Sequence, residues 1–269
     1  MITQASDDDR RAPATMLVVG GHPASAARTV LFGTTGACNN AFPFGPCTQK
    51  SELVQLDAAT GALVKDIGPV GFTVNGMAWD RKSQTLYAST AIGDVTFHGL
   101  ITINALTGKG RPVNSMVVNF GLAGGDSPIH SISIDGAGRI VGWYDEFGAG
   151  ATDAFVKINK RTGIATEFPS TGIDTAANGL SFDEVNYLWN IDTARGGINP
   201  TQSAYLIDPF TGKPLASVPL SPPKMAALGD FNPANNLYYG LNFSGPSAPT
   251  LHRGRRSPHG NRDRARANR

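Results

Sequence analysis

The chain has 269 residues, of which 41% are hydrophobic and 16% are charged, and this composition excludes an intrinsically disordered protein. No run of 18 apolar residues occurs, which excludes a membrane-spanning helix. The net charge of +2 comes from the last 18 residues, which hold seven arginines and one aspartate, so the rest of the chain is net acidic and offers no basic surface for nucleic acid.

The N-terminal segment, residues 1–14, contains the acidic run from Asp7 to Asp9, and we predict that it is disordered. An acidic start followed by a short apolar run is the wrong order for a secretory signal. Either the chain is cytosolic or its true start is missing.

From residue 15 to residue 250 the chain repeats a unit of strand, polar turn and strand. The copies are "TMLVVGGHPASAARTVLFGTT" (15–35), "VNGMAWDRKSQTLYAST" (74–90), "IHSISIDGAGRIVGWYD" (129–145), "ANGLSFDEVNYLWNID" (177–192) and "AALGDFNPANNLYYGLN" (226–242). The first strand of each unit is expected near 76–80, 131–135, 179–183 and 227–231 in the last four copies.

A second recurring piece lies between these units and ends in Thr-Gly at 60–61, 107–108, 162–163 and 211–212, with spacings of 47, 55 and 49 residues. Each copy has alternating apolar residues and then an Asp/Asn-x-x-Thr-Gly turn, in which Asp or Asn bonds its own backbone and Gly accepts a positive φ. The apolar residues here are predicted to be core: Leu53, Leu56, Ile101, Ile103, Phe155, Ile158, Leu206 and Ile207.

One period therefore contains four strands, which predicts an all-β protein, a β-propeller of four-stranded blades. The sequence supplies about four periods and part of a fifth, so the ring is either closed with a partial blade or incomplete. An immunoglobulin-like sandwich is a weaker alternative, because it gives no reason for the same turn chemistry at a fixed period.

Residues entering the inner strands of a propeller line one mouth of its central channel. In matched units these are Asn75, His130 and Asn178, with Lys224 and Met225 in the fourth. Polar groups that converge there would hold a cation or a small ligand. The alternative is that Asn-Gly is only the turn chemistry that a strand entry needs, and that His130 bonds a neighbouring backbone.

The "NGMAWD" and "ANGLSFD" units, with "ID-x-x-TG" between blades, resemble the secreted bacterial β-propellers that include gluconolactonase-like and streptogramin-lyase-like proteins. The resemblance runs from about Thr15 to Pro249. In gluconolactonase-like proteins an Asn before Gly helps to hold a divalent metal, which implies a cation such as calcium at Asn75 and Asn178. The chain departs from that pattern, because His130 replaces an Asn and no Glu stands at an equivalent position. The resemblance to streptogramin lyases rests on one match, the histidine His130 at the start of an inner strand.

Two cysteines, Cys38 and Cys47, lie in a loop rich in Gly, Pro and Asn. Their number and spacing do not suit a zinc site, and we predict a disulfide between them, which implies a periplasmic or extracellular protein. The alternative is two unpaired cysteines in a reducing cell.

The repeat predicts another strand and Thr-Gly turn after residue 250, but residues 251–269 are an arginine-rich tail without apolar periodicity. Advancing the reading frame by one nucleotide would restore an Ile-Val-Asp-like strand and a Thr-Gly. The tail is therefore predicted to be either disordered or frameshifted.

Two functions from different classes follow. The first is an exported, non-catalytic and monomeric propeller that presents its surface to a small molecule, a glycan or a protein. The second is a metal-assisted lactonase or lyase with its site at the central channel. The missing acidic ligand favours the first.

Overall fold

The computed structural model describes residues 13–19, 30–35, 50–91, 94, 97–122, 129–144, 152–175, 178–192, 203–220, 229–232, 235–242 and 250–256. Within these ranges the chain forms five antiparallel β-sheets, four with four strands and one with three. The described residues contain a single turn of 3₁₀ helix, η2 (Asn119–Gly121), and no helix that is long and apolar enough to cross a membrane.

The strands follow one another along the chain, and each sheet is built from consecutive strands. Blade 1 contains β1 (Pro13–Val19), β2 (Val30–Thr35), β3 (Glu52–Leu56) and β4 (Leu63–Pro69). Blade 2 contains β5 (Val74–Asp80), β6 (Thr85–Thr90), β7 (Leu100–Ile103) and β8 (Gly110–Pro112). Blade 3 contains β9 (Ile129–Ile134), β10 (Ile140–Tyr144), β11 (Ala154–Ile158) and β12 (Ala165–Glu167). Blade 4 contains β13 (Asn178–Phe182), β14 (Leu188–Asp192), β15 (Ser203–Ile207) and β16 (Pro214–Pro219), and blade 5 contains β17 (Gly229–Asn232), β18 (Leu237–Asn242) and β19 (Thr250–Arg256).

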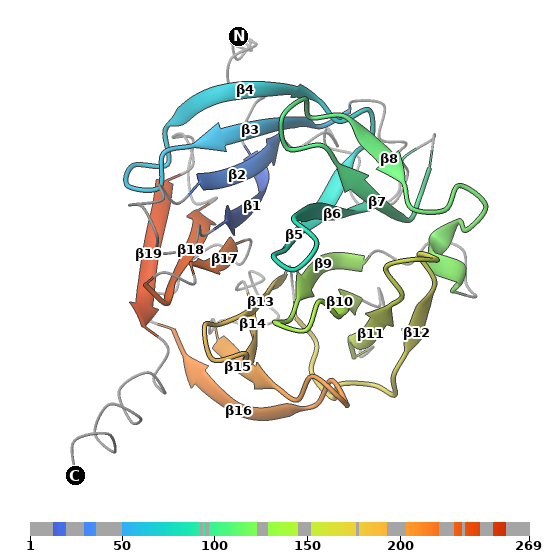
Figure 1. Ribbon diagram of the computed structural model, residues 1–269. Coiled ribbons are helices and arrows are strands. Elements are labelled where there is room, and N and C mark those ends of the chain that lie inside the picture. Colours follow the sequence, from blue (N-terminus) through green and yellow to red (C-terminus); the bar gives the residue numbers. More distant parts are fainter. Residues whose placement is uncertain are drawn as a thin grey trace, which may run out of the picture.

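The five sheets are arranged around a central axis, with the first strand of each sheet innermost and the last at the rim (Figure 1). Each inner strand contacts the inner strand of the next blade, and β1 contacts both β5 and β17. Blades 1 and 5 are therefore neighbours in the ring. The predicted all-β propeller of four-stranded blades with a partial fifth is confirmed, and the predicted inner strands coincide with β5, β9, β13 and β17.

The ends of the predicted propeller need correction. The tail was expected to lack regular structure, but its first residues belong to β19, which pairs with the free edge of β18. An open strand edge offers backbone donors and acceptors to any extended segment, so the pairing does not need an apolar pattern. At the other end β1 begins at Pro13, two residues before the predicted start. Residues 1–12 and 257–269 lie outside the described part of the chain.

The core consists of apolar layers between the blades, because each sheet buries both faces. Of the eight residues predicted to be core, seven are buried and Leu206 is half-buried against the layer between blades 4 and 5. Trp143 and Phe155 of blade 3, both fully buried, pack against Leu180 and Leu188 of blade 4. The same layered packing recurs between blades 2 and 3.

The Thr-Gly turns form as predicted. The Oδ1 atom of Asp57 accepts hydrogen bonds from the backbone N–H groups of Ala59 and Thr60 at 2.9 and 2.8 Å. The glycines of the four turns all have positive φ, between 74° and 77°. Asp or Asn at the first position and Gly at the fifth therefore fix the hairpin that joins the third and fourth strands of blades 1 to 4.

The antiparallel order gives the ring two different faces. All inner strands begin on one face, which we call the loop face, and Asn75, His130 and Asn178 stand at this end. The hairpins after the inner strands, which begin at Asp80 and Asp135, lie on the opposite face, which we call the turn face. β8 ends and β9 begins on the loop face, so the connection between these two strands is on that side of the ring.

Candidate functional site

The structure brings two of the predicted site residues together across a blade boundary. The side chain of Asn75 at the start of β5 lies 3.2 Å, from Nδ2 to Nδ1, from the ring of His130 at the start of β9. Both side chains are half-buried. An amide nitrogen is a donor, so this contact is a hydrogen bond when Nδ1 of His130 is the acceptor.

The Asn75-Gly76 pair is not a turn, because both residues lie within β5. Gly76 is needed for packing instead: a Cβ atom there would come within 3.0 Å of the carbonyl oxygen of His130 and the backbone nitrogen of Ile132. A glycine therefore favours the close approach of the inner strands of blades 2 and 3 at the position next to Asn75.

The side chains of the other predicted site residues lie outside the described part of the structure. Asn178 is the first residue of β13 and its backbone pairs with Asp192, but its side chain lies outside the described part of the structure. Lys224, Cys38 and Cys47 also lie outside it, so their roles stay predictions. The described residues contain no group of three or more His, Cys, Asp or Glu side chains that could hold a metal ion.

Serine hydroxyls link the inner strands of blades 3, 4 and 5. Ser131 Oγ accepts the backbone N–H of Leu180 at 3.0 Å, and Ser181 Oγ accepts that of Phe231 at 3.0 Å. Inner strands of different blades do not form a common sheet, so these hydroxyls satisfy backbone donors that face the axis. The serines at alternate positions of "HSISI" are a sequence signal for this contact, and the prediction of the site did not include them.

A hollow of about 30 Å³ lies between the inner strands and is lined by residues that include Ile132, Phe182 and Asp230. This volume is enough for a water molecule but not for an organic ligand.

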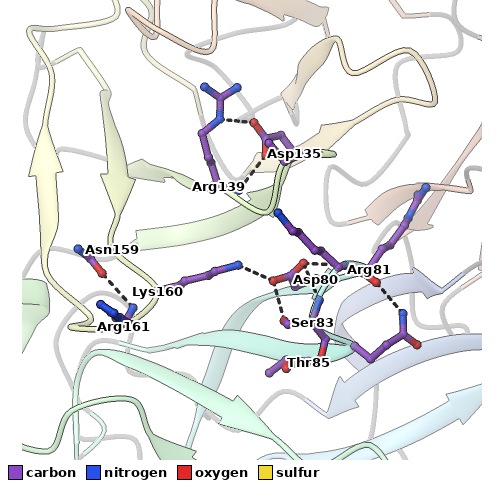
Figure 2. Close-up of polar contacts among 12 residues, drawn as sticks. Asp80, Arg81, Ser83, Thr85, Asp135, Arg139, Asn159, Lys160 and Arg161 are labelled. Carbon is purple, nitrogen blue, oxygen red and sulfur yellow. Dashed lines mark hydrogen bonds and ion pairs between the residues drawn. The ribbon is translucent and has the colours of Figure 1, made fainter.

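On the turn face an ion pair connects blades 2 and 3. The Nζ atom of Lys160, in the turn between β11 and β12, lies 2.8 Å from Oδ2 of the buried Asp80 (Figure 2). Asp80 also accepts hydrogen bonds from the hydroxyl of Ser83 and the backbone of Lys82 at 2.7 and 2.9 Å. Burial raises the pKa of Asp80, but the bonds from Lys160, Ser83 and Lys82 outweigh it, so the pKa is below its ordinary value.

Asparagine side chains make the corresponding links at the next two blade boundaries. Asn186 Oδ1 accepts the backbone N–H of Gly136 at 2.9 Å, and Asn236 Oδ1 accepts that of Glu184 at 3.2 Å. Both asparagines have positive φ, which Asn tolerates better than most residues. Gly138 is the equivalent residue in blade 3, and a Cβ atom there would lie 2.9 Å from Nζ of Lys160. A lysine bridge thus takes the place of an asparagine bridge.

A buried carboxylate lies between blades 3 and 4 near the loop face. Asp153 precedes β11, and its Oδ2 accepts hydrogen bonds from Nε1 of Trp143 at 2.9 Å and the backbone N–H of Thr175 at 2.8 Å. Its Oδ1 has no hydrogen-bond partner among the described residues. Burial raises its pKa to about 6, against the lowering effect of Thr175 and Trp143, and the charge of Asp174 adds to the rise. No pattern in the sequence indicates this group.

The whole chain matches no protein-family model and no curated protein. Among solved structures it is similar to hydrazine synthase of Kuenenia stuttgartiensis, with 14% identity, a TM-score of 0.45, and coverage of 79% of this chain and 52% of that one. A Dos1 propeller matches with 11% identity, a TM-score of 0.41, and coverage of 84% and 56%.

A chain from a nidogen/laminin complex matches with 14% identity, a TM-score of 0.44, and coverage of 78% of this chain and 76% of that one. The chain spans about half the length of the hydrazine synthase and Dos1 chains. All three TM-scores are below 0.5, so the propeller assignment rests on the sheets and their ring order in this chain.

Proposed function

We propose that the protein is a ligand-binding β-propeller whose site is the channel mouth on the loop face, around Asn75 and His130. The observation that carries the proposal is the 3.2 Å contact between these side chains, which come from different blades. A ligand that binds both would bridge the boundary between blades 2 and 3. The mouth is also on the face that bears the longer connections, and binding residues are disproportionately found on loops that a rigid scaffold positions.

The chemistry of the pair suggests the class of ligand. The Asn75 amide is an uncharged group with both a donor and an acceptor, and its Nδ2 faces Nδ1 of the His130 ring. Sugar hydroxyl groups also donate and accept, so a glycan or another hydroxyl-rich molecule suits this mouth better than a strongly charged ligand. We include Asn178 and Lys224 in the proposed mouth, on sequence position.

The proposal extends to the setting in which the protein works. A bond between Cys38 and Cys47 would form in an oxidising compartment, and this supports a periplasmic or extracellular location for a monomeric binding protein. A cation such as calcium at Asn75 and Asn178, and with it the lactonase or lyase activity, is the competing hypothesis for the same mouth.

Thermal unfolding in the presence of neutral trisaccharides tests the proposal. We expect cellotriose, maltotriose or the N-acetylglucosamine trimer to raise the melting temperature of the unchanged protein, and the rise to disappear in Asn75→Ala and His130→Ala. Lys109→Met, a change at an exposed residue of the turn face, serves as the control and should keep the rise. The absence of a rise with all three sugars would contradict the proposal. Calcium-dependent hydrolysis of glucono-lactone that is lost in His130→Ala would favour the enzyme.

A further inference from the structure

The turn face of blade 3 contains a second hollow, of about 350 Å³. Blade 3 supplies most of the lining, from the turn that begins at Asp135, from β10 and β11, and from the turn around Lys160. Phe182 and Pro209 of blade 4 complete it. The volume lies within the range of sites for small organic molecules.

Positive charge prevails along the lining. Arg139, Lys157 and Lys160 contribute cations, whereas Asp135 is the only carboxylate among the described lining residues. Arg139 is paired with Asp135, at 2.5 Å from Nε to Oδ2, and Lys160 is paired with Asp80 outside the hollow, at 2.8 Å. Figure 2 shows both pairs, with Arg139 and Lys160 reaching to different carboxylates.

Lys157 is held in a different way from the other two cations. Its Nζ atom lies 4.5 Å from the centre of the Phe168 ring and 5.5 Å from that of Phe210. Among the described residues no carboxylate lies within ion-pair distance of it. Asp208 is near, but its oxygens accept bonds from the backbone N–H of Phe210 at 2.9 Å and the hydroxyl of Thr211 at 2.7 Å. A half-buried ammonium on aromatic rings therefore keeps donor capacity for an anion.

Apolar surface lies beside these charges. Ile140, Ile158 and Ile164 line the hollow, and Ile164 is 45% exposed. Next to it the Phe210 ring, which is 57% exposed, carries the Arg139 guanidinium at 5.3 Å as well as Lys157. Ile140 and Ile158 are themselves buried, so the exposed apolar surface comes from Ile164 and Phe210. A cationic group beside such a surface suits a ligand with an anionic head and an apolar body.

We propose that this hollow binds a small organic carboxylate, with the carboxylate on Lys157 and Arg139 and the apolar body against Ile164 and Phe210. The site is separate from the channel mouth, because the hollow lies on the turn face and the mouth on the loop face. Its existence does not depend on the proposed function.

Calorimetric titration of the full chain with sodium phenylacetate tests the proposal. Benzyl alcohol, which has the apolar ring without the charge, and inorganic phosphate, which has the charge without the ring, are titrated for comparison. We expect saturable binding of phenylacetate that weakens as the salt concentration rises. Benzyl alcohol and phosphate should each bind at least about tenfold more weakly than phenylacetate, because benzyl alcohol lacks the negative charge and phosphate lacks the apolar ring.

Lys157→Met keeps an apolar side chain of similar length on the phenylalanine rings and removes the charge. We expect it to weaken phenylacetate binding by about tenfold or more. Phe210→Ala, a change at an exposed residue, should also weaken binding, while Lys109→Met in the matching turn of blade 2 and His130→Ala at the mouth should leave it unchanged. Binding that is absent in the unchanged protein, or is the same in Lys157→Met, would overturn the proposal, as would phosphate binding as tight as that of phenylacetate.

Discussion

Replacing the buried carboxylate of Asp153 by an amide should change how stability depends on pH. The pKa of Asp153 is about 6 in the folded protein, against an ordinary value of 3.8, so the folded state binds this proton more tightly. A raised carboxyl pKa means that stability from this residue is greatest below about pH 4 and falls as pH rises through 6. The difference of about two pKa units corresponds to a loss of about 3 kcal/mol at neutral pH.

Asp153→Asn keeps an acceptor for Trp143 and Thr175 and removes the charge. The free energy of unfolding of both proteins can be measured by urea titration with tryptophan fluorescence, between pH 4 and pH 7.5. We expect the variant to gain stability relative to the unchanged protein as pH rises from 4 to 7.5, by up to about 3 kcal/mol, since other groups cancel in the difference.

Asp174→Asn is the matched control, because Asp174 is exposed and affects Asp153 only through its charge. Its stability difference should change little with pH. A difference between Asp153→Asn and the unchanged protein that stays constant from pH 4 to pH 7.5 would show that Asp153 does not titrate as its burial implies.

Three further predictions concern the links within and between blades. Lys160→Met should lower the free energy of unfolding by about 1–2 kcal/mol at pH 7, since it leaves the buried Asp80 without its cation, and the loss should shrink as Asp80 is protonated below pH 4. Asn186→Ala should cost about 1–2 kcal/mol by urea titration, whereas Asn186→Gly should cost less because glycine tolerates the positive φ; equal costs would argue against backbone strain. Mass spectrometry of protein isolated under oxidising conditions should show Cys38 bonded to Cys47, with reduction costing about 2–3 kcal/mol; two free thiols would refute the bond.

The blade architecture could be predicted from the sequence because it depends on local and repeated signals. The turn that begins at Asp57 needs only a side chain that bonds the nearby backbone and a glycine that can adopt a positive φ, and both residue types can be recognised in the sequence. Recurrence of such turns at a regular interval then indicates blades. The repeat places a strand after residue 250, but the residues from Thr250 to Arg256 have no apolar periodicity of their own to indicate one, and they pair with the open edge of β18.

The site was predicted less completely, because it depends on contacts between blades. Asn75 and His130 were paired by their matching positions in two repeats, and the structure places them in contact. Of the two interpretations of the Asn75-Gly76 pair, turn chemistry does not apply, because both residues lie within β5 and Gly76 lies close to the backbone of the neighbouring blade. No sequence pattern indicated a role for Lys157 or Asp153. The environment of each side chain is formed by residues that are distant in the sequence and is known only from the structure.

Whether the loop-face mouth binds a ligand is tested most directly by the side-chain NMR signal of His130 during titration with the trisaccharide that gives the largest thermal shift. The chain has five histidines, so the signal can be assigned by its loss in His130→Gln. We predict that this signal moves saturably with the sugar and that the movement disappears in Asn75→Ala. Saturable binding of the sugar with an unmoved His130 signal would show that the loop-face mouth is not the binding site.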